Sequence, residues 1–529
     1  MRSLRAAALL SATASSLLIT GGVARAAYGS PGGSAPPPDG RALLVCNGSA
    51  PGGCPATGTA TVYRTIQSAV NASRNGDWIL VWPGLYQEDV TVDRRHGLSN
   101  GLHIRGMDRN GVLLDGSYSR SSDHGVYVIG VDNTWVENMS AQNYQYHSGN
   151  AFWWAGVKGY WGNHLTAYNN ANYGTYAYNS TNPSYALGSF VYDYASWNGD
   201  SGVYIGDCTV CNAVITNGHF EHNAIGYSGT NAGGNLTVEN SEWDHNLSGI
   251  VPNTLLSEPN YPQRGVIIQG NYVHDNNDGN APGSGITALA PLGVGIELAG
   301  GSENIVQNNL VTNEKHNGVL IHWLMTPAMD NKVLDNSFDH VGYGKTPGDA
   351  DIGVEAGSPQ NCFSGNVDTT GGKPRAATTD PPGIAWLNDC RGGPGGNPTV
   401  GNCPGPGACL PAIYQPGDPI LSVGTALNAA GVSERRSYGG PGPHPEAQQG
   451  MSNPCDGAPD SAWCSGGRIA PGLAIPSSPG RVPAPIKPPS SGSLPVAAAH
   501  AGTGTRQAAT IRRPPLDVSE WRSRWIRSL

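Results

Sequence analysis

The chain has 529 residues, and only 13% of them are charged, about half the share that is usual in a globular domain. This low share excludes a coiled coil or a long helical bundle, and the 75 glycines and 41 prolines indicate many tight turns. The formal net charge is -9 without long runs of like charge, so the sequence lacks the basic surface that nucleic-acid binding requires.

The first residues have the pattern of a secretory signal peptide. Arg2 and Arg5 precede an apolar or small-residue stretch over residues 6–23, and Ala24-Arg25-Ala26 offers a cleavage site. We therefore expect an exported, extracellular protein that is cleaved near Ala26 and acts as a monomer. No later stretch has the 18 apolar residues of a membrane span, which predicts no integral membrane association.

Ten cysteines fit an oxidising compartment, because an even number in an exported chain favours disulfides. Proximity along the chain suggests five pairs, although connectivity cannot be deduced from spacing alone. The pairs are Cys46/Cys54, Cys208/Cys211, Cys362/Cys390, Cys403/Cys409 and Cys455/Cys464. The spacing of Cys208 and Cys211 also occurs in redox and zinc sites, but a second such motif is missing, and we interpret this pair as a structural disulfide.

The central part of the chain repeats loosely. Asparagine closes similar segments at spacings of 23 to 30 residues, at Asn143, Asn169, Asn198, Asn223, Asn246 and Asn276. Short apolar segments that begin with glycine, such as Gly202-Val-Tyr-Ile and Gly265-Val-Ile-Ile, open many of the same units. This period predicts a solenoid of strands. Asparagine suits its turns because it tolerates the left-handed conformation and because stacked amides can hydrogen-bond from coil to coil.

Two segments near the N-terminus give a family resemblance. Thr65-Ile-Gln-Ser-Ala-Val70, followed by Gly76-Asp-Trp-Ile-Leu-Val-Trp-Pro-Gly-Leu-Tyr86, resembles the opening of right-handed parallel β-helix proteins of the pectate-lyase-like superfamily. The resemblance covers about residues 40–370. It implies an all-β, right-handed parallel β-helix (the pectin lyase fold) with a short N-terminal capping helix. It implies no activity, because this fold hosts lyases, hydrolases, epimerases and non-catalytic adhesins.

The repeat stops near residue 370, and 25 of the 41 prolines follow it. Such Pro-rich segments are extended and poorly able to form a core. We therefore predict a signal peptide over residues 1–26, a β-helix over residues 27–370, and a Pro/Gly-rich, mostly irregular and partly disordered C-terminal extension over residues 371–529.

An aromatic concentration is the first candidate site. Residues 144–204 hold 17 of the 40 aromatic side chains. Exposed tryptophan and tyrosine rings bind sugars through their apolar faces, whereas inward-pointing rings would stack in the core instead. The candidate polysaccharide-binding residues are Trp153, Trp154, Trp161, Tyr176 and Tyr178.

The second candidate site is a stripe of acidic residues and histidines. Glu221-His222, Asp244-His245 and His274-Asp275 occupy similar places in successive repeats, and Asp339-His340 follows in a later one. Equivalent positions on adjacent coils lie about 4.8 Å apart. Neighbouring carboxylates raise one another's pKa, so Glu221 or Asp244 is a candidate general acid, with His245 and His274 beside them. A solvated polar row is the alternative, and so is a divalent cation such as Ca²⁺; we assign no metal ligand and no cofactor.

Other signals are weaker. Glu297, Glu355 and His322 lie near strands, and we interpret them as structural. Residues 125–370 contain five lysines and arginines against 22 acidic residues, which disfavours a lyase on polyuronate, because such an enzyme needs a basic residue to take the proton. The motifs of polygalacturonases and of mannuronan epimerases are missing.

Two functions from different classes follow. The first is a secreted β-helix that binds polysaccharide without catalysis. The second is a polysaccharide-active enzyme, and a hydrolase on a neutral glycan suits the sequence better than a Ca²⁺-dependent lyase or an epimerase. A structural solenoid of the envelope is a further alternative. If the acid and histidine stripe shares a groove with the aromatic side chains, the enzyme hypothesis gains; if the two lie on different faces, it fails.

Overall fold

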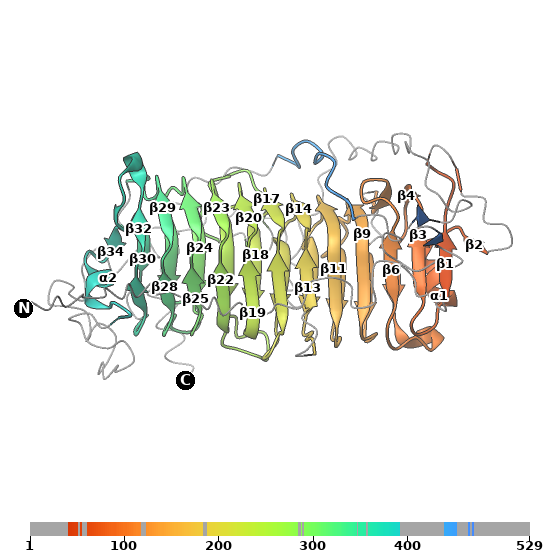
Figure 1. The fold of residues 1–529 in the computed structure, drawn as a ribbon, viewed down its shortest axis with the longest axis horizontal. Helices are drawn as coiled ribbons and strands as arrows, with labels where there is room; N and C mark the ends of the chain where they lie inside the picture. The colour runs from red at the N-terminus through yellow and green to blue at the C-terminus, as the bar shows by residue number, and fades with distance from the viewer. Residues whose placement is uncertain are drawn as a thin grey trace, which may run out of the picture.

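The computed structural model describes residues 41–391, except 51–52, 55–60, 118–122, 184–187, 284–286, 288–289, 346–347 and 356–357. It also describes residues 439–451, 464–465 and 468–469. The predicted signal peptide lies outside these residues. The described chain winds into an elongated, right-handed solenoid of parallel strands, which confirms the predicted fold class (Figure 1).

Sheet B forms one face of the solenoid with eleven parallel strands. They are β5 (Val90–Val92), β8 (His124–Ile129), β10 (Asn150–Ala155), β12 (Thr175–Tyr178), β15 (Ser201–Gly206), β18 (Ile225–Thr230), β21 (Ser248–Asn253), β24 (Val294–Ala299), β27 (Asn317–His322), β30 (Ala350–Val354) and β34 (Thr379–Asp380). Each successive strand comes from the next coil, as the parallel pairing requires.

The second sheet forms the other two faces, which the long strands β9 (Thr134–Gln142) and β11 (Tyr160–Tyr168) join. We call its first face A1: β1 (Ala42–Val45), β2 (Val62–Tyr63), β3 (Trp78–Val81), β6 (His103–Gly106), β13 (Gly188–Val191), β16 (Ala213–Thr216), β19 (Gly233–Glu239), β22 (Arg264–Gln269), β25 (Ile305–Gln307), β28 (Lys332–Leu334) and β31 (Cys362–Ser364).

We call the remaining face A2: β4 (Gly84–Tyr86), β7 (Val112–Asp115), β14 (Tyr194–Ser196), β17 (His219–Glu221), β20 (Glu242–Asp244), β23 (Tyr272–His274), β26 (Leu310–Thr312), β29 (Ser337–Asp339) and β32 (Val367–Asp368). Strand β33 (Arg375–Ala376) pairs antiparallel with β32, and β35 (Cys464–Ser465) pairs antiparallel with β36 (Arg468–Ile469).

Helix α1 (Ile66–Ala72) covers the first coil, as the Thr65–Val70 segment predicts. The hydroxyl of Thr65 caps the helix by accepting a hydrogen bond from the main-chain N–H of Ser68, at 3.1 Å. Ile66, Ala69 and Val70 point into the core, so the helix closes the apolar end of the solenoid. Two short 3-10 turns, η1 (Arg94–His96) and η3 (Thr370–Gly372), interrupt the coils.

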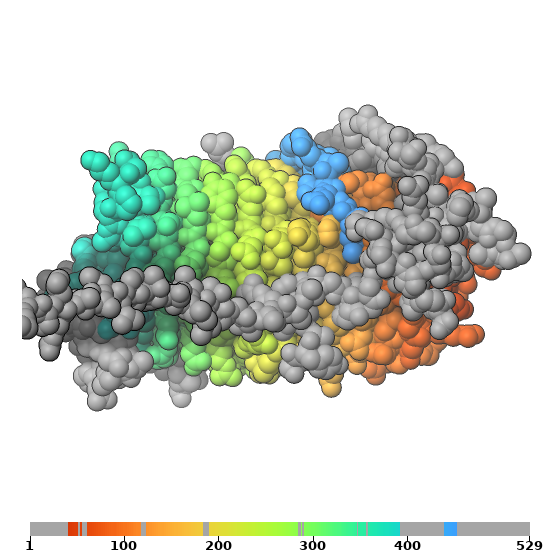
Figure 2. Space-filling model, in the orientation of Figure 1, coloured from red at the N-terminus to blue at the C-terminus, as the bar shows by residue number. Residues whose placement is uncertain are grey.

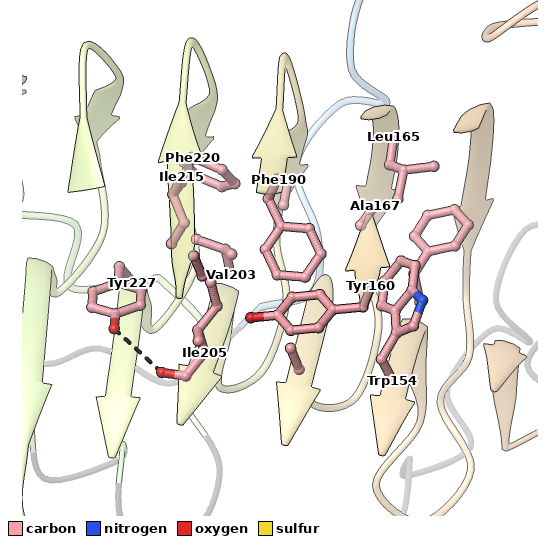
Figure 3. Close-up of a cluster of buried hydrophobic side chains, with 14 of the residues drawn as sticks. Trp154, Tyr160, Leu165, Ala167, Phe190, Val203, Ile205, Ile215, Phe220 and Tyr227 are labelled. Atoms are coloured by element: carbon pink, nitrogen blue, oxygen red, sulfur yellow. Dashed lines mark hydrogen bonds between the residues drawn. The ribbon is translucent and has the colours of Figure 1, made fainter. Parts of the chain in front are cut away.

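The core is a continuous column of inward-pointing side chains, because alternate residues of each strand face inward. Its middle section contains the large rings of Trp154, Tyr160, Phe190, Phe220 and Tyr227 (Figure 3). The buried hydroxyl of Tyr227 donates to the main-chain carbonyl of Ile205 at 3.3 Å, so the ring adds bulk without leaving a buried donor unpaired.

A ladder of buried asparagine side chains runs along one corner of the solenoid. Each side-chain N–H donates to the side-chain oxygen of the next coil, at 2.8 to 3.3 Å. The ladder consists of Asn170, Asn198, Asn223, Asn246 and Asn276, and it ends on the carboxyl of Glu314. The predicted coil-to-coil amide bonds are therefore present.

The left-handed conformation occurs at the residue directly before each ladder asparagine, and not at the ladder asparagine itself as we expected. Asn143 and Asn169 have φ of 61° and 54°, whereas the stacked asparagines of the ladder are not among the left-handed residues. The same left-handed position holds Trp197, His222 and His245 in the following coils. Asn169 also donates its side-chain N–H to the side-chain oxygen of Asn143 at 2.8 Å, so in these two coils one asparagine has both expected properties.

A segment of the C-terminal extension lies on the N-terminal coils, and we call residues 439–451 the strap. It crosses face A2 near β7, β9, β11 and β14 (Figure 2). Arg109 and Asn110 donate to its carbonyls, at Gln449 and Gln448, over 2.8 Å each. This part of the extension, which we expected to be irregular and partly disordered, is held against the solenoid without regular secondary structure.

Three of the predicted disulfides are present: Cys46–Cys54, Cys208–Cys211 and Cys362–Cys390. Cys403, Cys409 and Cys455 lie outside the described residues, and the side chain of Cys464 is not among those described. The last disulfide and helix α2 (Ile384–Leu387) belong to the final coil. No helix in the described part of the chain has the length and apolarity of a membrane span.

Candidate functional site

The predicted acid and histidine stripe lies on the outer surface of face A2. Glu221 pairs in register with Asp244, and Asp244 with His274, on strands β17, β20 and β23. The central residue of each of these three-residue strands points into the core: Phe220, Trp243 and Val273. Because side chains alternate along a strand, the flanking polar residues point outward. The equal positions predicted from the repeat are therefore adjacent in space.

The residues that follow each strand belong to the same surface. His222, His245 and Asp275 have φ of 54°, 53° and 54°. This left-handed turn brings each side chain back toward that of the residue before it, so His245 contacts Asp244 and His274 contacts Asp275. We call the set of His219, Glu221, His222, Glu242, Asp244, His245, His274, Asp275 and Asp278 the acid–histidine cluster.

Asp244 is the centre of the acid–histidine cluster. Its Oδ1 lies 2.7 Å from Nε2 of His219 and its Oδ2 lies 2.6 Å from Nδ1 of His245. Burial favours the neutral acid, but the hydrogen bonds from these two histidines outweigh it and hold the pKa of Asp244 well below its usual range. The group is a carboxylate at neutral pH. This charge state disfavours the general-acid role that we expected for Asp244, and that role stays a prediction.

The other histidines are also paired with carboxylates. Nδ1 of His222 lies 2.8 Å from Asp278, a residue of the loop after β23. His274 uses both ring nitrogens, Nδ1 on Asp275 at 2.9 Å and Nε2 on Glu242 at 3.1 Å. The hydroxyl of Tyr194 donates to Glu221. Three overlapping groups bring possible metal-ligand atoms within 4.8 Å of one another: Glu221/His222/His245, His219/Glu221/Asp244 and Glu242/Asp244/His274.

The later acid–histidine pair is separate from the acid–histidine cluster. Asp339 continues the outward row of His274, but Thr312 stands between them in register. The distance along the solenoid is therefore two coils, or about 10 Å. His340 has φ of 55° and stacks on Tyr343 instead of on a histidine of the cluster.

Among the aromatic candidates, Trp153 and Tyr176 lie on the outer surface of sheet B. They continue a row with Tyr127, and the ring centroids are 4.3 Å and 5.2 Å apart. The strand register explains the row, since Tyr127 pairs with Trp153 and Trp153 with Tyr176. We call these three residues the aromatic row. Tyr178 lies beside this aromatic row with a ring tilted by 42° to that of Tyr176.

The other two aromatic candidates lie elsewhere. Trp154 points inward from β10 and is fully buried in the core (Figure 3). Its indole N–H donates to the main-chain carbonyl of Thr134. Trp161 lies on face A1, where it stacks on Trp135 at 4.2 Å and is almost completely buried. Neither side chain shares a surface with the aromatic row, so we do not include them in a binding site.

Tyr204 follows Tyr176 in register, and it contacts a carboxyl group that the sequence did not single out. Glu258, in the loop after β21, reaches back to Tyr204, whose hydroxyl lies 3.2 Å from its Oε1. Burial, with the nearby charge of Asp207, raises the pKa of Glu258 to about 7. No periodic signal marks Glu258, because it comes from a loop and not from a repeat position.

Sheet B also contains two of the three residues that we interpreted as structural, and the third, Glu355, directly follows its strand β30. Nε2 of His322 lies 2.6 Å from Oε1 of Glu297, and its Nδ1 lies 4.0 Å from Glu355. All three residues are buried. Burial lowers the pKa of His322, but the hydrogen bond and the charge of Glu297 outweigh it and raise the pKa.

The acid–histidine cluster and the aromatic row occupy different faces, A2 and B respectively. The aromatic row and the acid–histidine cluster therefore do not share one groove. Each set is therefore considered as a site of its own.

Comparison with known proteins agrees with this architecture. A family model described as "Right handed beta helix region" matches residues 150–338. The described chain has the fold of a right-handed parallel β-helix. No curated protein sequence matches the chain of this β-helix protein.

Solved structures with a similar fold belong to several functional classes. The A-module of mannuronan C-5 epimerase AlgE4 from Azotobacter vinelandii is 14% identical, with 58% of this chain and 83% of that chain covered and a TM-score of 0.45. Endo-xylogalacturonan hydrolase from Aspergillus tubingensis is 12% identical, with 63% of this chain and 95% of that chain covered and a TM-score of 0.43. PfbA, a surface adhesin of Streptococcus pneumoniae, is 10% identical, with 63% of this chain and 94% of that chain covered and a TM-score of 0.37.

Proposed function

We propose that this β-helix protein is exported and binds a polysaccharide along the aromatic row of sheet B. The signal-peptide pattern and the three disulfides support export. The polysaccharide-binding hypothesis rests mainly on Tyr127, Trp153 and Tyr176, which form a half-buried row across three successive coils.

The geometry of the rings indicates how a sugar would bind. The faces of Tyr127 and Trp153 pack against each other and the indole N–H of Trp153 is buried, so the outer edges of the two rings remain for a ligand. Tyr178 makes a tilted contact with Tyr176 and, among the described residues, stacks on no other ring. Its face suits the apolar C–H face of a sugar, and the partly buried carboxyl group of Glu258 can accept hydrogen bonds from sugar hydroxyls.

The test is a glycan-binding screen of the exported form, with and without Ca²⁺. We expect Tyr178→Ala and Trp153→Ala to weaken binding at least about tenfold, because each removes aromatic contact area. Tyr192→Ala is the matched control, since Tyr192 is an exposed tyrosine in the turn after β13, away from sheet B. Equal binding by all four proteins, at unchanged thermal stability, would show that the row does not bind the glycan.

A second candidate function is hydrolysis of the bound polysaccharide. The pKa of about 7 for Glu258 favours it, because a carboxyl group that is partly protonated at neutral pH can act as a general acid. Asp207 carries the second carboxyl group of this region. New reducing ends that disappear in Glu258→Gln would support this function, and an ultraviolet-absorbing unsaturated product would indicate a lyase instead. Binding without any product supports the non-catalytic function.

A further inference from the structure

The acid–histidine cluster on face A2 is not used by the proposed polysaccharide site. Its nine members come from three successive strands and the turns and loop that follow them. Five are carboxylic acids, and the polar partners described for them include all four histidines. Such a set can be a structural network of ion pairs or a site for a cation. The arrangement of the ring nitrogens distinguishes the two.

We propose that Glu221, His222 and His245 bind a divalent transition-metal ion. One possible ligand atom from each residue lies within 4.8 Å of the others. Atoms that share an ion at about 2.1 Å lie at most about 4.2 Å apart, so small rotations complete the site. The side chains have room for these rotations, since that of His245 is 46% exposed and that of His222 is 28% exposed.

The second ring nitrogen of each histidine is already held. Nδ1 of His222 contacts Asp278 at 2.8 Å, and Nδ1 of His245 contacts Asp244 at 2.6 Å. A carboxylate on one imidazole nitrogen is the usual support of a metal-binding histidine, because it fixes the tautomer and leaves the other nitrogen as the donor. Here Nε2 remains on both rings. Nε2 of His222 lies 3.9 Å from Glu221, on the side of the third ligand.

The other two groups of possible ligands lack this arrangement. His274 has a carboxylate on each ring nitrogen, so it has no nitrogen left for an ion without breaking a contact. Nε2 of His219 is bonded to Asp244, which already holds His245. The group formed by Glu221, His222 and His245 is thus the one in which two rings and a carboxylate can meet an ion while their supports stay in place.

A neighbouring aromatic ring fixes one of the ligands. The indole of Trp197 stacks on the ring of His222 with centroids 4.7 Å apart and planes within 6°. Trp197 occupies the same left-handed turn position in the preceding coil. It orients the His222 ring, whereas His245 lies on the exposed side. Three protein ligands with an open side leave coordination positions for water or for a small ligand.

The donor types indicate which metal ions fit. Two imidazoles and one carboxylate suit Zn²⁺ and neighbouring first-row ions. Ca²⁺ takes six to eight oxygen ligands and is disfavoured by ring nitrogens. The Ca²⁺ considered from the sequence is therefore the wrong ion for this set of ligands.

The test is titration of the full exported chain, after chelation and dialysis, with Zn²⁺ and separately with Co²⁺ and Ca²⁺. We expect one Zn²⁺ per chain and a visible Co²⁺ spectrum, with Ca²⁺ unable to compete. His222→Ala and His245→Ala are each expected to abolish the site. Asp278→Asn is expected to weaken binding about 10- to 100-fold, because it removes the support of His222.

His340→Ala is the matched control, since His340 has the same left-handed conformation two coils beyond His274 and lies outside the acid–histidine cluster. It is expected to bind Zn²⁺ as the unmodified protein does. If a histidine variant does not fold, as judged by circular dichroism, Glu221→Gln replaces it. The proposal is overturned if no Zn²⁺ binds, if His222→Ala binds it unchanged, or if Ca²⁺ displaces it at similar concentration. None of these results depends on polysaccharide binding.

Discussion

Nδ1 of His245 lies 2.6 Å from Oδ2 of Asp244, although the two residues are consecutive in the chain. Consecutive side chains of a strand point to opposite sides, so this contact requires that the strand end between them. It does: β20 ends at Asp244, and His245 has φ of 53°. The turn places both side chains on the outer surface and creates an acid–histidine pair from adjacent residues.

The adjacent tryptophans of β10 are expected to respond differently to truncation. Trp154→Ala removes a fully buried ring and leaves a cavity, and we expect it to lower the free energy of unfolding by about 3–5 kcal/mol. Trp153→Ala removes a half-buried ring on the surface of sheet B and is expected to lower it by less. Urea unfolding of the two variants measures this. Equal losses would contradict the assignment of Trp154 to the core and Trp153 to the surface.

The asparagine ladder is expected to contribute strongly at its middle. Asn223 is fully buried, accepts from Asn198 at 2.8 Å and donates to the carbonyl of Ala195 at 3.0 Å. Asn223→Ala removes the acceptor of the main-chain N–H of Asn198, which lies at 3.0 Å, and interrupts the ladder, so we expect a loss of about 1–3 kcal/mol in the free energy of unfolding. Asn71→Ala, at an exposed position of α1, is the control and is expected to change it by less than about 0.5 kcal/mol. A small effect of Asn223→Ala would show that water replaces the ladder.

Glu314 is expected to make stability depend on pH. Burial raises its pKa to about 8, from a usual value near 4.5. The folded state therefore holds a proton that the unfolded state releases, and this contribution is complete below about pH 4.5 and lost as the pH rises through 8. Between pH 5 and 8 the free energy of unfolding should fall by up to about 1.4 kcal/mol per pH unit relative to Glu314→Gln. Parallel pH profiles of the two proteins would exclude this role.

The strap is expected to depend on Gly442. A Cβ atom at this position would lie 2.5 Å from Cζ2 of Trp197, closer than packed atoms allow. Gly442→Ala should therefore loosen the strap and speed hydrogen exchange at the N–H of Met451, which donates to Asn138 at 2.7 Å. Gly439→Ala is the matched control, because no atom lies within 4 Å of its Cβ position. Equal protection of Met451 in both variants would contradict the close contact.

The sequence predicts those parts of the molecule that repeat. Residues at equal positions of successive coils become neighbours, so the repeat alone places Glu221, Asp244 and His274 in one stripe. It does not place Asp278 and Glu258, because they reach these surfaces from loops whose lengths follow no period. The alternation of a strand shows that Trp153 and Trp154 point to opposite sides, but the side that is the core depends on how the coil closes.

The charge state of Asp244 also lay beyond the sequence. Counting neighbouring carboxylates suggests a raised pKa, yet its closest described partners are the rings of His219 and His245, which lower it. The sign depends on contacts of less than 3 Å, and those contacts arise from the left-handed turn at His245 and from the register between β17 and β20.

The strap makes part of face A2 a surface with a tethered ligand. Its 13 residues would bind weakly as a free peptide, but the covalent connection gives them an effective concentration of the order of millimolar. Attachment and release are therefore events within one molecule and do not depend on how dilute the protein is. Any partner that binds around Tyr168 and Trp197 has to compete with a segment that never diffuses away.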